Sequence, residues 1–112
     1  MYLAAKKPQN TEKYKQIKAD LINQLERNGN NQPIFLDMVD NYMIMWSTAQ
    51  LLKADIDKRG VSVEYNNGGG QSGLKKNESV ELFNKTNAQM LKLLADLKIR
   101  PSTNGSIEDE TL

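Results

Sequence analysis

The sequence contains no histidine and no cysteine among its 112 residues. Their absence excludes Ser-His-Asp and Cys-His catalytic arrangements, the usual zinc sites and any disulfide framework. Carboxylate, amine and hydroxyl groups are the only reactive side chains that remain. We therefore expect a protein that is not an enzyme, with no catalytic residue, no metal site and no cofactor.

Aromatic residues and long apolar runs are also scarce. Aromatic side chains make up 6% of the chain and charged ones 26%. No run approaches the ~18 apolar residues of a membrane-spanning helix, and residues 1–8 lack the apolar core of a secretory signal. These absences predict a soluble, cytoplasmic protein that does not enter a membrane. Because a chain of this length buries only a modest share of its surface, we also expect a homo-oligomer.

The net charge is only +1, but the charges are unevenly distributed. Residues 1–18 hold five lysines against one glutamate, and an acidic run, Glu108 to Glu110, lies near the other end. We divide the chain into a basic N-terminal arm (1–10), a single helical domain (11–101) and an acidic tail (102–112). The tail has too few apolar side chains to offset the entropy of ordering it. We therefore expect the tail to be mobile.

Apolar spacings of three and four predict a first helix over residues 11–27, with Asn10 or Thr11 as its N-cap and Asn28-Gly29 as its end. A second helix is predicted from Pro33 to Arg59, followed by Gly60. It carries one apolar stripe and a second apolar set off that stripe, namely Leu36, Met43, Ile44 and Leu51. A helix that is apolar on more than one face needs several packing partners. In so small a domain, this pattern favours packing between subunits.

Val61, Val63 and Tyr65 alternate with polar residues, and Asn67-Gly68 is a strong two-residue turn signal. The return strand is weak, so a short hairpin and a flexible loop both remain open. A third helix is predicted after Asn77 as N-cap, ending near Ile99 because Pro101 cannot continue it. The predicted fold class is all-α: an antiparallel hairpin of two long helices plus an N-terminal helix, with a small β-hairpin or Gly-rich loop between the long helices.

Two patterns could suggest a chemical site. The spacing of Gly68 and Gly73 matches a phosphate-binding loop, but Leu74 stands where that loop needs its lysine. The carboxylate pairs Asp37 with Asp40 and Asp55 with Asp57 have no third ligand, and residues two apart on a helix do not share a face. We interpret the first pair as structural, and the second pair does not form a site.

Lysines are the more suggestive group, because they attract nucleic-acid phosphates without sequence preference. The candidate DNA-binding residues are Lys6, Lys7, Lys13, Lys15, Lys18, Lys75 and Lys76. Aromatic and methionine side chains at helical spacing indicate a packed seam. The candidate oligomer-interface residues are Tyr42, Met45, Trp46, Leu52, Phe83, Met90 and Leu94. Periodicity alone does not separate interface positions from core positions.

Several ordered segments resemble a family of small subunits of tailed-phage terminases, the DNA-packaging factors. The resemblance covers residues 14–103 and rests on Leu25 to Gly29, the helix closure at Ile56 to Val61, the Lys75-Lys76-Asn77 entry, and the ending at residues 93–102. It implies a non-enzymatic, ring-forming homo-oligomer in the cytoplasm of a bacterial host. Such a protein binds double-stranded viral DNA when packaging begins and delivers it to the large terminase subunit.

The chain departs from the family pattern at two places. Glu78 stands where members often have proline, and acids follow Pro101-Ser102 where members often have basic residues. The second departure argues against DNA binding by the tail and fits contact with a protein better. The alternative function is a helical adaptor that binds other proteins without binding DNA.

Overall fold

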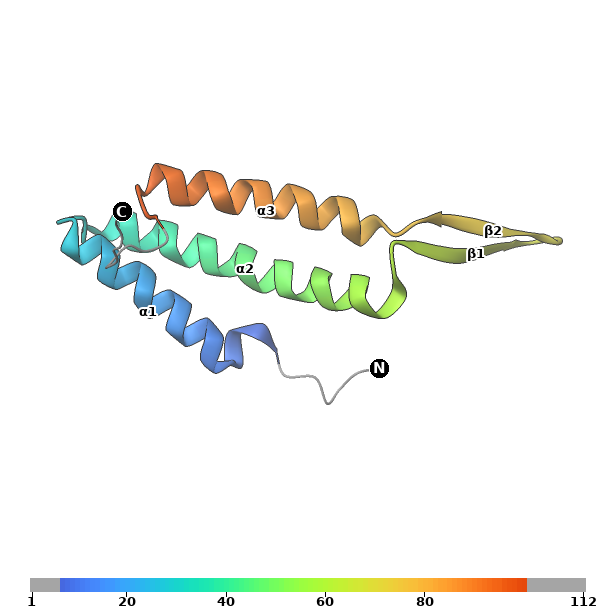
Figure 1. Ribbon diagram of the computed structural model, residues 1–112, viewed down its shortest axis with the longest axis horizontal. Helices are drawn as coiled ribbons and strands as arrows, with labels where there is room; N and C mark the ends of the chain where they lie inside the picture. The colour runs from blue at the N-terminus through green and yellow to red at the C-terminus, as the bar shows by residue number, and fades with distance from the viewer. Residues whose placement is uncertain (1–6, 101–112) are drawn as a thin grey trace, which may run out of the picture.

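The computed structural model describes residues 7–100 and shows three helices with a projecting β-hairpin (Figure 1). A 3₁₀ turn, η1 (Pro8–Asn10), precedes α1 (Glu12–Arg27) and α2 (Pro33–Arg59). The hairpin strands β1 (Ser62–Gly68) and β2 (Gln71–Lys76) lead into α3 (Glu78–Asp96). The protein is therefore mostly helical but not plainly all-α, because a two-stranded antiparallel sheet joins the long helices.

Helix α2 is the centre of the fold, with α1 on one side, α3 on the other and the hairpin extending beyond the helices (Figure 1). Leu21 and Leu25 of α1 meet Val39, Met43, Trp46 and Ala49 of α2 in the core, which Met90, Leu97 and Ile99 complete. Tyr14 packs edge to face on Trp46, with ring centroids 5.9 Å apart. The core therefore lies between α2 and the sides of α1 and α3 that face it.

Side-chain caps fix the starts of α1 and α3 where the sequence predicts them. The hydroxyl of Thr11 accepts a hydrogen bond from the Tyr14 backbone N–H, and the side chain of Asn77 accepts one from the Ser79 backbone N–H. Both caps satisfy a backbone donor that the first helical turn leaves unpaired.

The end of α3 differs from the prediction. The helix ends at Asp96 rather than near Ile99, because Lys98 takes a left-handed conformation with φ +58°. The Ile99 N–H then donates to the Leu94 carbonyl at 3.0 Å, and the Lys98 N–H donates to the Ala95 carbonyl at 3.0 Å. This is a Schellman motif, which ends a helix locally. The helix has therefore already ended before Pro101 is reached.

The hairpin turn also lies elsewhere than predicted. The strands pair from Ser62 with Lys76 to Gly68 with Gln71, which leaves Gly69-Gly70 as the two-residue loop instead of Asn67-Gly68. Gly69 and Gly70 have φ of +55° and +84°, as a tight hairpin turn of the primed type requires. A register shift between Asn66 and Gly68 absorbs the extra residue. The run of glycines thus moves the turn by two positions.

The predicted arm and tail lie mostly outside the described residues, which begin at Lys7 and end at Arg100. Of the arm, Pro8 is buried and belongs to the 3₁₀ turn. Between residues 7 and 100, no helix is long and apolar enough to cross a membrane.

Candidate nucleic-acid and subunit interfaces

Asn77 joins the helical pair to the hairpin. It is 1% exposed, and its side-chain amide donates to the Gly60 carbonyl at 2.8 Å and to the Asp55 carboxylate at 3.2 Å. Its side-chain oxygen accepts from the Ser79 backbone N–H at 2.9 Å and from Arg59 at 3.1 Å. Its backbone N–H donates to the Val61 carbonyl at 2.8 Å. One buried side chain therefore fixes the end of α2 and the start of α3.

Asp55 organises the other half of this junction. Arg59 donates to both of its carboxylate oxygens at 2.7 Å, and the Ser79 hydroxyl donates to one of them at 2.6 Å. Hydrogen bonds from Arg59 and then Ser79 hold the pKa of the Asp55 carboxyl well below its usual range. The carboxylate in turn raises the pKa of the Arg59 guanidinium. We call Asp55, Arg59, Asn77 and Ser79 the junction network.

Sequence reasoning identified Asn77 as a helix cap but assigned no role to Asp55 or Arg59. The two are four residues apart on α2, so their pairing has a sequence signal. Their connection to Asn77 and Ser79 spans 18 to 24 residues, and no local spacing reports it.

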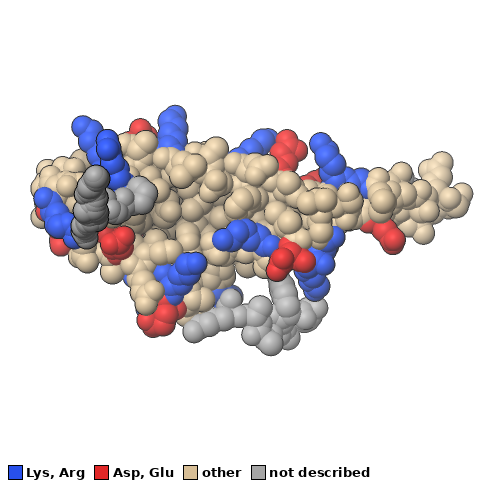
Figure 2. All heavy atoms as spheres, viewed as in Figure 1, with Lys and Arg blue, Asp and Glu red and all other residues tan. Residues whose placement is uncertain are grey.

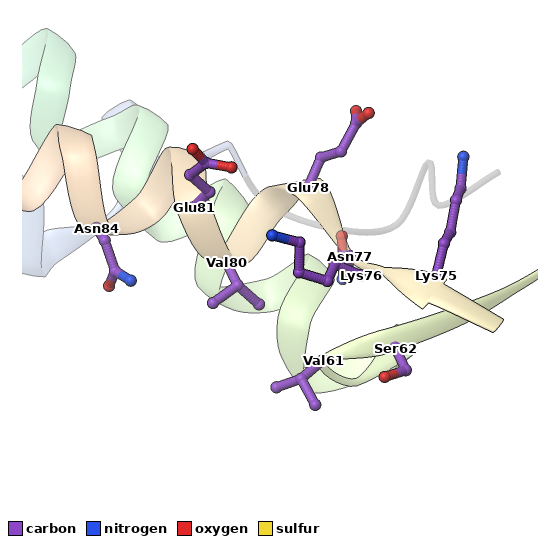
Figure 3. A pocket seen from close by; sticks show the side chains of 9 residues that line it. All are labelled: Val61, Ser62, Lys75, Lys76, Asn77, Glu78, Val80, Glu81 and Asn84. Carbon is purple, nitrogen blue, oxygen red and sulfur yellow. The ribbon is translucent and has the colours of Figure 1, made fainter.

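Lys75 and Lys76 lie at the base of the hairpin, immediately before Asn77. Both are exposed, and Figure 3 shows their side chains pointing in different directions. They border a depression of about 670 Å³ between the hairpin base and the first turns of α3. Val61 and Val80 also line it, and Glu78 and Glu81 balance the two lysines. The depression therefore has no net charge.

The N-terminal lysines lie on a different part of the protein. Lys7, Lys13 and Lys15 are exposed, and Lys18 is half-buried, whereas Lys6 lies outside the described residues. The Lys15 amine is 3.9 Å from Glu12 and the Lys18 amine is 3.4 Å from Asp40. Such surface pairs are worth little, so both amines can exchange a carboxylate for a phosphate.

The structure does not gather the predicted DNA-binding lysines into one cluster. Lys13, Lys15 and Lys18 lie on α1, whereas Lys75 and Lys76 end β2, and Figure 1 shows that α1 and the hairpin do not pack on one another. On the face seen in Figure 2, lysines and arginines are spread over the helices with acids between them, and the hairpin tip carries no charge.

The predicted interface residues lie mainly on the inner side of the helices. Trp46 and Met90 are buried in the core of the single chain, and packed against that core are Tyr42, Met45, Phe83 and Leu94. Leu52 is half-buried. Their burial within one chain needs no second subunit, and whether any of them also contacts one stays a prediction.

The outer face of α2 is a stronger candidate for a subunit contact. Ile44 is 64% exposed and Leu51 is 57% exposed, although both lie in the middle of the central helix. Leu51 follows Ile44 by seven positions, which is about two helical turns, so the two side chains share a face. Thr48 lies between them and is also exposed. Residues 41–52 contain no charged side chain. We call Ile44, Thr48 and Leu51 the outer face of α2.

Residues 7–100 contain no group of three or more metal-ligating side chains.

A family model described as phage terminase, small subunit, matches residues 15–111. The chain belongs to this family, and the resemblance seen in the sequence is confirmed. No curated protein and no solved structure matches the chain.

The junction network predicts an unequal cost for removing two helix caps. Asn77→Ala should lower the free energy of unfolding by about 2–3 kcal/mol, because it removes a cap and leaves the half-buried Gly60 carbonyl without its donor. Thr11→Ala removes a partly exposed cap and the hydroxyl's hydrogen bond to the Pro8 carbonyl, but it leaves no fully buried group unpaired and should cost about 1 kcal/mol. Urea denaturation of both variants measures the difference. Equal costs would show that the junction network adds nothing to the cap.

The lowered pKa of Asp55 also predicts a pH dependence. The stabilisation that Asp55 contributes is fully present above its unfolded pKa, near 3.9, and is lost as pH falls toward its folded pKa. The free energy of unfolding should therefore fall more steeply below pH 4 in the wild type than in Asp55→Asn. Urea denaturation between pH 2 and pH 6 tests this, and parallel curves would contradict it.

Proposed function

We propose that the protein acts as the small subunit of a phage terminase in the bacterial host cytoplasm. It forms a homo-oligomer without catalytic activity, binds double-stranded viral DNA when packaging begins, and works with the large ATPase and nuclease subunit. The observation that carries this proposal is membership of the family over residues 15–111. Two surfaces of the chain support its separate parts.

The outer face of α2 supports the oligomer. Helices α1 and α3 cover two sides of α2 and leave Ile44 and Leu51 in solvent. Completing the burial of two such side chains is worth about 3 kcal/mol per contact. Residues 41–52 carry no charge, so burying this face against another subunit removes no charged side chain of that segment from water.

The double variant Ile44→Ser with Leu51→Ser should therefore dissociate the oligomer. Light scattering after size exclusion should give the wild type a mass several times 12.7 kDa and the variant a lower, concentration-dependent mass. Leu91→Ser is the matched control, because Leu91 is 59% exposed on α3 and lies outside this face. A monomeric wild type, or equal loss of mass in the control, would reject the assignment.

The lysines of α1 and of the hairpin base support DNA binding. Exposed lysine amines neutralise phosphates and release condensed counterions, which makes affinity fall with salt. In a ring, the lysines of α1 and those of the hairpin base would each occur once per subunit. Both groups would therefore be repeated around the assembly. Contact through phosphates requires no base-reading side chain.

Neutralising these lysines should weaken binding to all DNA sequences alike. We expect Lys13→Gln, Lys15→Gln and Lys18→Gln together to reduce the slope of log affinity against log salt by about 0.9 for each phosphate that is no longer neutralised. Lys75→Gln with Lys76→Gln tests the second group, and Lys6→Gln with Lys7→Gln tests the arm. Fluorescence anisotropy with a labelled duplex gives the slopes.

The control for this series removes the same charge elsewhere. Lys58, Lys85 and Lys92 are exposed on α2 and α3, and their triple glutamine variant should keep the wild-type slope. Equal slopes in all variants would reject the lysine assignment. Absence of salt-dependent binding in the wild type would favour the adaptor function instead.

A further inference from the structure

A groove at the end of the helical bundle opposite the hairpin has features that the proposed function does not use. Its volume is about 810 Å³, and it lies between Asn28, at the end of α1, and the last turn of α3. Leu91, Leu94 and Ala95 supply its apolar surface. Lys98 and Arg100 supply two cations. Among the described residues, neither cation forms a salt bridge.

Charge distinguishes this groove from three other depressions on the described surface. The depression at the hairpin base has two lysines and two glutamates, and the one beside Phe83 has Lys53 and Asp57. The depression on the hairpin has one charged residue, Glu64. The groove at the end of α3 therefore combines an apolar surface with a net charge of +2, and its complement is an acidic segment with apolar side chains.

We propose that residues 107–112 of the same chain bind in this groove. Their sequence is Ile-Glu-Asp-Glu-Thr-Leu, which places three consecutive acids between two large apolar residues. The acids would pair with Lys98 and Arg100, and Ile107 or Leu112 would cover the apolar surface. No other part of this sequence has three adjacent acids.

The connection between groove and segment makes the contact intrachain. Arg100 itself lines the groove, and residues 101–106 separate it from Ile107. Six residues span up to ~20 Å, enough to turn back over the last turn of α3. A tether this short gives an effective concentration in the millimolar range, so contacts with the groove would offset the ordering entropy that the tail's own side chains do not offset.

Occupation of the groove would neutralise the two cations at this end of the bundle and close its apolar surface to other chains. It would assign the acidic run to a surface of the same chain. The proposal does not depend on DNA binding or on the outer face of α2.

Disulfide trapping tests the contact directly, because the chain has no native cysteine. The double variant Ala95→Cys with Thr111→Cys of the 112-residue chain should form an intrachain disulfide about tenfold faster than Ala88→Cys with Thr111→Cys. Ala88 is also an exposed alanine of α3 and lies within reach of the same tether, but it does not line the groove. Non-reducing electrophoresis separates intrachain from interchain products. Equal rates, or an interchain product alone, would overturn the proposal.

A charge exchange tests the chemistry of the contact. Lys98→Glu with Arg100→Glu should slow trapping at Ala95→Cys to the control rate. Adding Glu108→Lys, Asp109→Lys and Glu110→Lys should restore it, which also shows that the reversed variant folds. Trapping that is indifferent to both changes would overturn the electrostatic assignment. All rates are measured without DNA, and light scattering on the same samples reports assembly separately.

Discussion

The set of hydrogen bonds around Asn77 is the constraint on which the arrangement of the long helices depends. After α2 ends at Arg59, the chain forms a hairpin that has no hydrophobic core of its own. It then begins α3, which must pack against α2. Asn77 is bonded to Gly60 and Asp55 on the outgoing side and to Ser79 on the returning side. These hydrogen bonds join the end of α2 to the start of α3. Movement of the hairpin therefore does not have to disturb the packing of α2 on α3. An isolated two-stranded hairpin is marginally stable in water, and this junction gives it a fixed base.

Once α3 is fixed against α2, the central helix has two covered sides and one open side. Helices α1 and α3 cover four side chains of α2, namely Val39, Met43, Trp46 and Ala49. They leave Ile44 and Leu51 exposed. The second apolar set that the sequence shows on this helix therefore divides: Met43 completes the core of the single chain, and Ile44 and Leu51 remain outside. The apolar residues of a helix that are candidates for a subunit contact can be identified only when the residues that pack within the chain are known.

The elements that local chemistry controls were predictable, and those that depend on distant contacts were not. Caps at Thr11 and Asn77 gave the starts of α1 and α3 correctly, because each cap bonds a backbone group two or three residues away. The turn at Gly69-Gly70 was misplaced because three adjacent glycines all tolerate positive φ, and the strand register chooses between them. The end of α3 was misplaced because Lys98 carries no sequence signal for a left-handed conformation. The role of Asp55 was missed because its partners Asn77 and Ser79 are more than 20 residues away. Trp46 and Met90 met the criteria for interface residues, since an apolar stripe does not record which chain covers it.

The charges on the exposed surfaces determine what each surface can bind. A charge that is buried between subunits without a partner costs free energy, so an apolar contact surface gains from having none. Residues 41–52 satisfy this condition, and Thr48 between Ile44 and Leu51 adds a hydroxyl rather than an ion. The groove at the end of α3 is the opposite case, because two cations beside Leu91 would repel a second copy of the same groove. An acidic segment would match its two cations. The uncharged apolar face of α2 and the groove with two cations are thus separate surfaces of a protein whose net charge is only +1.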